Sequence, residues 1–106
     1  MSYDVHLEAD LGGPEPITFG DWNCTSNLAR MWCDAGADLR TFNGQPAGWC
    51  AEKLRAALRI LRDDPGHFQA MDPPNGWGSY ADLLPALDRL LEMFENAPKA
   101  TVRVGW

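Results

Sequence analysis

Tyr3-Asp4-Val5-His6-Leu7-Glu8 opens the chain with a strict alternation of apolar and polar side chains. A period of two is typical of a strand that buries one face and leaves the other in water. The last residues, Ala100 to Trp106, alternate in the same way. We therefore predict a strand at each end of the chain. After the break at Gly12–Pro14, a short second strand is expected at Ile17–Phe19, on a sheet edge because Pro16 precedes it.

The middle of the chain carries helical spacing instead. A long helix is predicted from near Pro46 to about Asp63, since proline is tolerated in the first helical turn and the apolar residues recur at helical spacing. A second long helix is predicted from about Asp82 to Asn96, with Asp82 as its cap, because this start leaves Pro85 in the first turn. The apolar residues expected on the buried faces are Cys50, Leu54, Ala57, Leu58 and Leu61 for the first, and Leu83, Leu87, Leu90, Leu91 and Phe94 for the second.

Two shorter helices complete the pattern. Thr25 or Ser26 is expected to cap one that runs to about Ala35, where Gly36 supplies a left-handed stop. Asp64-Pro65 is a helix start signal for another that ends near Met71. The stretch from Pro73 to Gly78 is predicted to be a stiff loop, because it lacks two backbone donors and holds two glycines.

These elements predict a single α+β domain over residues 1–106. A small two- or three-stranded sheet is formed by the chain ends, and two longer and two short helices pack on one of its faces. A three-stranded sheet is expected to leave two open edges, at which strands of two copies could pair.

The formal net charge of −6 argues against nucleic acid as a partner, because phosphate binding needs clustered lysine and arginine. A small ligand or a basic protein surface fits this charge better. No run approaches the ~20 apolar residues that span a bilayer, and the N-terminal residues do not resemble a signal peptide. We therefore expect a cytoplasmic protein with no membrane partner.

Enzymatic signals are sparse. Cys24, Cys33 and Cys50 are an odd number without close spacing, which favours free thiols over disulfides or a metal site. His6 and His67 are the only candidates for a general base near neutral pH, and neither lies near a cysteine in sequence. A cysteine–histidine enzyme is thus a weak hypothesis, and no catalytic residue, metal or cofactor is predicted.

Two polar segments are the candidate binding residues. Asp21–Asn27 places amides and hydroxyls around an expected helix start, where they could attract a ligand or simply cap the helix. Pro73–Tyr80 combines a rigid loop with aromatic side chains that could form a stacking platform, although Trp77 could equally fill the core beneath the loop. The predicted ligand-binding residues are Asn23, Ser26, Asn27, Asn75, Trp77 and Tyr80.

The two long helices carry opposite charges. One helix presents arginines and the other presents acids, at positions Arg55, Arg59 and Arg62 and at Asp88, Glu92 and Glu95. These stripes either lie against each other or are plain solvated faces.

Several of these stretches carry a resemblance. The opening strand, the segment Asn23–Asn27 with Met31-Trp32, the loop Pro73–Tyr80 and the closing strand resemble small uncharacterised proteins of actinobacteriophages and related bacterial genomes. The resemblance implies a phage origin and a place in the host cytoplasm, and it implies no activity. Cys24 stands where an aromatic residue is expected, which argues against an essential nucleophile there.

Together, these features favour a small non-enzymatic binding protein that recognises a host protein or a small ligand through the two polar segments. The alternative is a self-associating structural module, in which the charge stripes or the terminal strand pair between copies to form a homo-oligomer.

Overall fold

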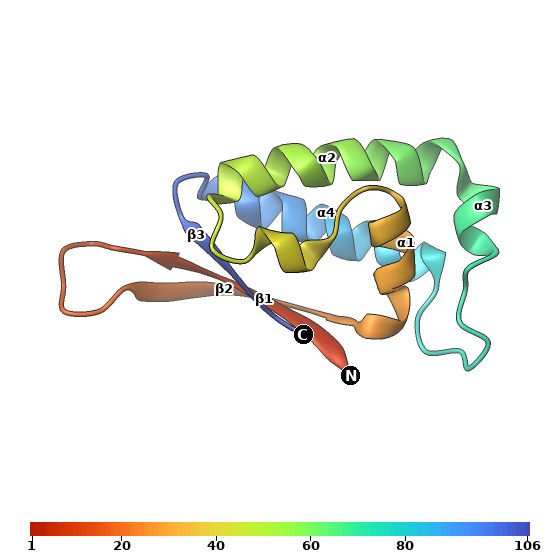
Figure 1. Ribbon diagram of the computed structural model, residues 1–106, viewed down its shortest axis with the longest axis horizontal. Coiled ribbons are helices and arrows are strands. Elements are labelled where there is room, and N and C mark those ends of the chain that lie inside the picture. Colours follow the sequence, from red (N-terminus) through yellow and green to blue (C-terminus); the bar gives the residue numbers. More distant parts are fainter.

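The computed structural model describes all 106 residues. Its sheet contains three antiparallel strands, β1 (Ser2–Ala9), β2 (Ile17–Thr25) and β3 (Thr101–Gly105), in the order β2-β1-β3. The two chain ends therefore lie side by side in one sheet, as Figure 1 shows. This arrangement confirms the predicted α+β class and the sheet made by the chain ends.

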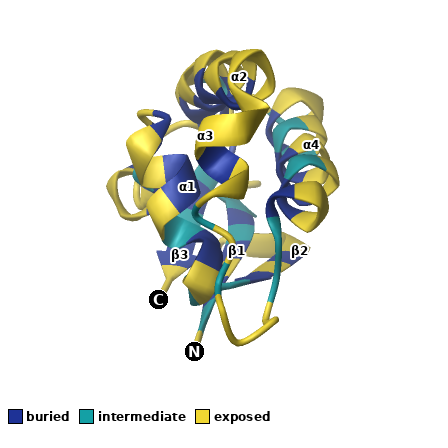
Figure 2. Ribbon diagram, turned by 90° about the vertical axis from the view of Figure 1, so that its right-hand side faces the viewer, coloured by how far each residue is buried: buried dark blue, intermediate teal, exposed yellow.

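The helices all lie on one face of the sheet. The two long helices are α2 (Ala47–Asp63) and α4 (Tyr80–Asn96), and the two short ones are α1 (Ala29–Asp34) and α3 (Pro65–Gln69). Figure 2 shows α2 and α4 above the strands, with buried residues between the layers. None of the helices has the length and apolarity needed to cross a membrane.

One continuous core fills the space between the two layers. The strands contribute the predicted alternate residues Tyr3, Val5, Leu7, Val102 and Val104, which are all buried. Every predicted core residue of α2 is buried as well, whereas Leu91 of α4 is only partly buried. The opposite face of the sheet remains uncovered and polar.

β2 is longer than predicted. The predicted strand stopped at Phe19, and residues 21–27 were assigned to a helix start, but β2 continues to Thr25. A bulge makes this possible, because Val5 pairs with Trp22 while Leu7 pairs with Phe19, so that two residues of β2 lie opposite one of β1. Gly20 at this bulge has φ of +72°, a conformation that favours glycine.

The start of α4 also differs from the prediction. The helix begins at Tyr80, and the hydroxyl of Ser79, not Asp82, caps it by accepting from the backbone N–H of Asp82 at 3.2 Å. Asp72 accepts from the N–H of Tyr80 at 2.7 Å. These two bonds, with the burial of Tyr80, offset the hydrogen bond that Pro85 removes inside the helix.

The opposite charge stripes of the long helices do face each other in part. Arg62 donates to Asp88 at 2.6 Å and Arg55 donates to Glu95 at 3.2 Å. Four of the six residues that were expected to attract a second copy are therefore paired within one chain, and Arg59 and Glu92 are not.

The outer edge of β3 is covered by the segment Asn43–Ala47. Val102 donates its N–H to Gln45 at 2.9 Å and accepts from Gly44 at 2.7 Å. The N–H of Val104 donates to the side-chain oxygen of Asn43 at 3.0 Å. The prediction of two open edges is thus wrong, because only β2 lacks such a cover.

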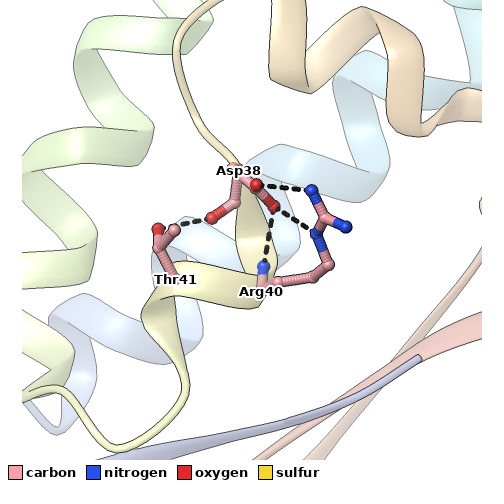
Figure 3. Close-up of polar contacts among 3 residues, drawn as sticks. All are labelled: Asp38, Arg40 and Thr41. Atoms are coloured by element: carbon pink, nitrogen blue, oxygen red, sulfur yellow. Dashed lines mark hydrogen bonds and ion pairs between the residues drawn. The ribbon is translucent and has the colours of Figure 1, made fainter.

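A short 3-10 helix, η2 (Leu39–Phe42), directly precedes the segment Asn43–Ala47 that covers β3. Asp38 caps it by accepting from the backbone N–H of Arg40 at 3.1 Å, and its carboxylate also accepts from the Arg40 guanidinium at 2.8 and 3.0 Å (Figure 3). The hydrogen bonds from Arg40 lower the pKa of Asp38 below its usual value. Thr41 donates its hydroxyl to the carbonyl of Asp38 at 2.6 Å. This element was absent from the sequence prediction.

Candidate functional site

A cavity of about 470 Å³ lies where the N-terminal end of β1 meets the end of β2 and the loop before α4. Its lining residues are Met1, Ser2, Asn23, Thr25, Asn27 and Trp77. The two polar segments that the sequence singled out therefore adjoin in space. They meet at the uncovered face of the sheet, because Asn23 and Thr25 alternate along β2 with the buried Trp22 and Cys24.

A close backbone approach brings the loop to the strand. Gly78 has φ of +96°, and a Cβ atom placed on it would lie 3.0 Å from Cγ2 of Thr25 and 3.1 Å from Cδ1 of Leu28. A side chain at this position would force Thr25 and Leu28 to shift by a few tenths of an ångström. Glycine is thus favoured here both by the left-handed backbone and by the tight space.

The loop that carries Trp77 is fixed at both ends. Asn75 accepts from the backbone N–H of Trp77 at 3.0 Å through its side-chain oxygen, which is the pattern of an Asx turn. On the other side, Ser79 caps α4 and Asp72 holds the N–H of Tyr80. The indole of Trp77 nevertheless stays 70% exposed, so it does not fill the core beneath the loop.

The polar groups beside Trp77 differ in how far the chain already uses them. Asn23 donates from its side-chain nitrogen to Asp4 at 2.7 Å, which leaves its amide oxygen free. The hydroxyl of Thr25 accepts weakly from the N–H of Asn27 at 3.4 Å. The side-chain amide of Asn27 is exposed and makes no hydrogen bond within the chain. A partner would therefore find both donors and acceptors at this cavity.

Three of the predicted site residues do not line the cavity. Tyr80 is buried, stacks on Phe68 and donates its hydroxyl to the carbonyl of Leu61 at 2.5 Å, so it is a core residue and not a platform for a ligand. The amide oxygen of Asn75 serves the turn. Ser26 donates to the carbonyl of Met1 at 3.1 Å, which ties the end of β2 to the start of β1.

Thr25, Met1 and Ser2 line this surface but were not among the predicted ligand-binding residues. Thr25 lies in the polar segment Asp21–Asn27 and was expected to cap a helix, which it does, because it caps the 3-10 helix η1 (Ser26–Leu28). Alternation with Trp22 and Cys24 was the available signal that Thr25 belongs to a strand. Nothing in the sequence placed Met1 and Ser2 next to Trp77.

The backbone of β2 adds a second feature at the same place. In an antiparallel pair, residues that exchange hydrogen bonds alternate with residues whose N–H and C=O point away from the partner strand. The N–H of Ser26 donates to the carbonyl of Met1 at 3.1 Å, which sets this alternation along β1 and β2. Asn23, opposite Asp4, therefore directs its N–H and C=O to the open edge, and Thr25, opposite Ser2, directs its N–H there, while its carbonyl begins η1.

The covered edge supports the same assignment. Val102 and Val104 direct their backbone groups away from β1, toward residues 43–45. Leu7 and Val5 lie opposite them, so these odd-numbered residues of β1 bond with β2. The residues of β2 that bond with β1 are therefore Trp22 and Cys24, and Asn23 and Thr25 alternate with them.

The thiols are poorly suited to nucleophilic chemistry. Burial raises the pKa of Cys24 to about 11 and that of Cys50 to about 12, and it also raises the pKa of the exposed Cys33. Each histidine lies near a carboxylate, His67 at 2.6 Å from Asp34 and His6 at 3.7 Å from Glu8. No group of three or more histidine, cysteine or acidic side chains has the geometry of a metal site.

Two further concavities lie elsewhere. One of about 580 Å³ separates the projecting β1–β2 hairpin from the turn between α4 and β3, and Leu11, Phe19 and Pro98 give it an apolar lining. The other, of about 300 Å³, lies between α2 and α4 and is lined by three arginines, of which Arg55 and Arg62 are already paired with acids. Neither contains either of the polar segments.

No family model matches the chain, and comparison with curated proteins and with solved structures likewise gives no match.

Proposed function

We propose that this protein is a small binding module without chemistry of its own, and that it holds its partner at the cavity formed by Asn23, Thr25, Asn27 and Trp77. The observation that carries the proposal is the 70% exposed Trp77 on a loop whose backbone is fixed from both sides. Exposed tryptophans at protein surfaces are frequent anchors of binding energy.

Fixation of the loop matters because ordering a mobile side chain on binding costs about 0.5–1.5 kcal/mol. The Asx turn at Asn75 and the Ser79 cap hold the loop before any partner arrives. Asn27, in the 3-10 helix η1 directly after β2, then supplies a side-chain amide that is unused within the chain. The combination of an aromatic surface and free amides suits a protein partner.

The resemblance to phage proteins supports a protein of the bacterial host as that partner. The charge of −6 supports the same reading, because it disfavours nucleic acid and favours a partner with basic groups. Self-association is less well supported, since most of the charge-stripe residues and the β3 edge are already occupied within one chain.

Capture from an actinobacterial lysate tests the proposal. Trp77→Ser is compared with Trp106→Ser, which removes another exposed tryptophan, 60% exposed, directly after β3 on the covered side of the sheet. We expect the unmodified chain and Trp106→Ser to retain the same protein, and Trp77→Ser to retain at least tenfold less of it, as the loss of a hot-spot residue predicts. Equal retention by all three chains would assign Trp77 to the scaffold and reject the site.

A further inference from the structure

We infer that the partner presents an extended, basic peptide segment that pairs with the open edge of β2 as a fourth strand, so that one of its side chains contacts Trp77. This inference rests on the proposed function and narrows it, because it names the form in which the partner binds. A peptide that adds to a sheet edge gains affinity from main-chain hydrogen bonds and specificity from its alternate side chains.

The backbone of β2 provides the first argument. Asn23 directs both its N–H and its C=O to the open edge, and Thr25 directs its N–H there, while the carbonyl of Thr25 begins the 3-10 helix η1. The same two residues line the cavity. A small rigid ligand has no repeating set of donors and acceptors to match them, whereas an extended peptide does. Asn23 is exposed at this edge.

The position of Trp77 provides the second argument. The loop approaches β2 at Thr25, where the Cβ position of Gly78 is 3.0 Å from Cγ2 of that residue. A strand that pairs with this part of β2 runs past Trp77. Successive side chains of a strand point to opposite faces, so every second side chain of the peptide reaches the cavity side of the sheet.

Charge identifies the chemistry of the peptide. Asp4 and Asp21 are exposed on β1 and β2. Neither strand contains a lysine or an arginine, so the strands at this edge carry carboxylates that no lysine or arginine of the same strands balances. Lysine or arginine in the peptide complements this charge and speeds association.

The same charge disfavours a second copy of this chain as the occupant. Pairing β2 with the β2 of another copy would bring together two chains that each carry −6. The β3 edge offers no alternative, since Asn43–Ala47 already occupies it.

The experiment pans a displayed library of random 12-residue peptides against the full chain and measures the affinity of the selected peptides for two variants. Asn23→Ala removes the side chain and keeps the outward N–H, whereas Asn23→Pro removes both. Proline is tolerated at an edge strand when the missing N–H faces outward, and a thermal melt verifies that the variant folds. We expect lysine- and arginine-rich peptides whose affinity for Asn23→Pro is roughly tenfold lower than for Asn23→Ala, as the loss of one hydrogen bond and the added ring predict.

A second measurement needs no variant of the protein. One selected peptide is resynthesised with a single N-methyl group at each position in turn. In strand addition only the N–H groups that face β2 matter, so we expect loss of binding at every second position. This measurement remains decisive if Asn23→Pro fails to fold.

The other outcomes overturn the inference in distinguishable ways. In one outcome, the peptides bind Trp77→Ser more weakly but bind Asn23→Pro and Asn23→Ala equally, and N-methyl groups have no periodic effect. This outcome rejects strand addition and leaves the proposed site intact. Failure to select any peptide also rejects it, while the lysate comparison decides the proposed function separately. A dimer that forms at tens of micromolar and disappears in Asn23→Pro would assign the edge to a second copy.

Discussion

The two outer strands of the sheet end in different ways. At β3, the segment Asn43–Ala47 accepts and donates the hydrogen bonds that the strand directs away from the sheet. At β2, both outward backbone groups of Asn23 and the N–H of Thr25 have no such cover, and a cavity and an exposed tryptophan lie beside them. Open edges invite pairing and are usually protected. The chain protects one edge with its own backbone, and this contrast is the basis on which we propose the other as a recognition surface.

Proline substitutions at the two edges should give the largest difference in the free energy of unfolding between the covered and the open edge. Val102→Pro removes the N–H that donates to Gln45 and leaves that carbonyl without its partner. Relative to Val102→Ala, which accounts for about 2 kcal/mol of lost packing, we expect a further loss of about 2 kcal/mol in the free energy of unfolding. Urea denaturation followed by tryptophan fluorescence measures both variants.

Asn23→Pro against Asn23→Ala is the matched pair at the open edge. Because the N–H of Asn23 has no partner within the chain, the proline should cost less than about 1 kcal/mol beyond the alanine. An equal penalty at both edges would mean that β2 is covered after all.

Glycine-to-alanine substitutions in the loop should show how strongly the Trp77 loop depends on contact with β2. Gly76 and Gly78 both have positive φ, so alanine strains each by about 1 kcal/mol. Only Gly78 lacks room, with Thr25 and Leu28 3.0 and 3.1 Å from its Cβ position, whereas nothing lies within 4 Å at Gly76. We expect Gly78→Ala to lower the free energy of unfolding by about 1 kcal/mol more than Gly76→Ala does. If chemical denaturation gave the same free energy of unfolding for both variants, the loop would not pack closely on β2.

β1 and β3 were predictable from the sequence because the alternation of apolar and polar residues in each is unbroken. Residues 3–8 and 100–104 keep one parity throughout, and that parity matches the buried face. β2 changes parity at the bulge of Gly20 and Asp21, so a simple period of two ends at Phe19. The polar residues beyond the bulge then look like a capping segment, although they form the wet face of a strand.

The edges and the site could not be predicted for a different reason. Which segment covers β3 depends on where residues 43–47 lie in space, and no local pattern encodes that placement. The two polar segments could be identified, but not their contact. Tyr80 was assigned to the surface because Trp77 is its neighbour in sequence, while the helix that starts at Tyr80 turns it to the same buried face as Leu83 and Leu87.

Asparagine-to-alanine substitutions test the two edges with a smaller change. Asn43→Ala removes the oxygen that accepts from the N–H of Val104, a residue that is 8% exposed, so this N–H loses its partner. We expect a loss of about 1–2 kcal/mol in the free energy of unfolding. Asn23→Ala removes an exposed bond to Asp4 and should stay within about 0.5 kcal/mol. Urea titrations that rank the two substitutions in the opposite order would contradict the assignment of the covered edge.

Thiol alkylation tests the contrast without any substitution. Cys24 lies on β2 beneath α4, and Cys50 lies behind the covered edge with its sulfur 3.8 Å from the carbonyl of Phe42. With pKa values of about 11 and about 12, Cys24 should hold about ten times more thiolate than Cys50 at a given pH. Mass spectrometry after iodoacetamide treatment should therefore show the exposed Cys33 labelled first, Cys24 next and Cys50 last. Labelling of Cys24 as fast as Cys33 would show that the open-edge strand detaches from the core.

The same pKa values fix the sign of the pH dependence. Both buried thiols have a folded pKa above the unfolded value of ~8.5, so the unfolded chain releases these protons first as the pH rises. Their contribution to stability is thus complete below about pH 8.5 and is lost progressively toward pH 11 and beyond. Cys24→Ala and Cys50→Ala should each flatten part of this decline in urea titrations from pH 8 to pH 10. The decline begins at the unfolded pKa that both thiols share, so the two substitutions should flatten it by similar amounts over this range. A decline carried by Cys50 alone would contradict the raised pKa of Cys24, because it would mean that Cys24 already loses its proton in the folded chain at these pH values.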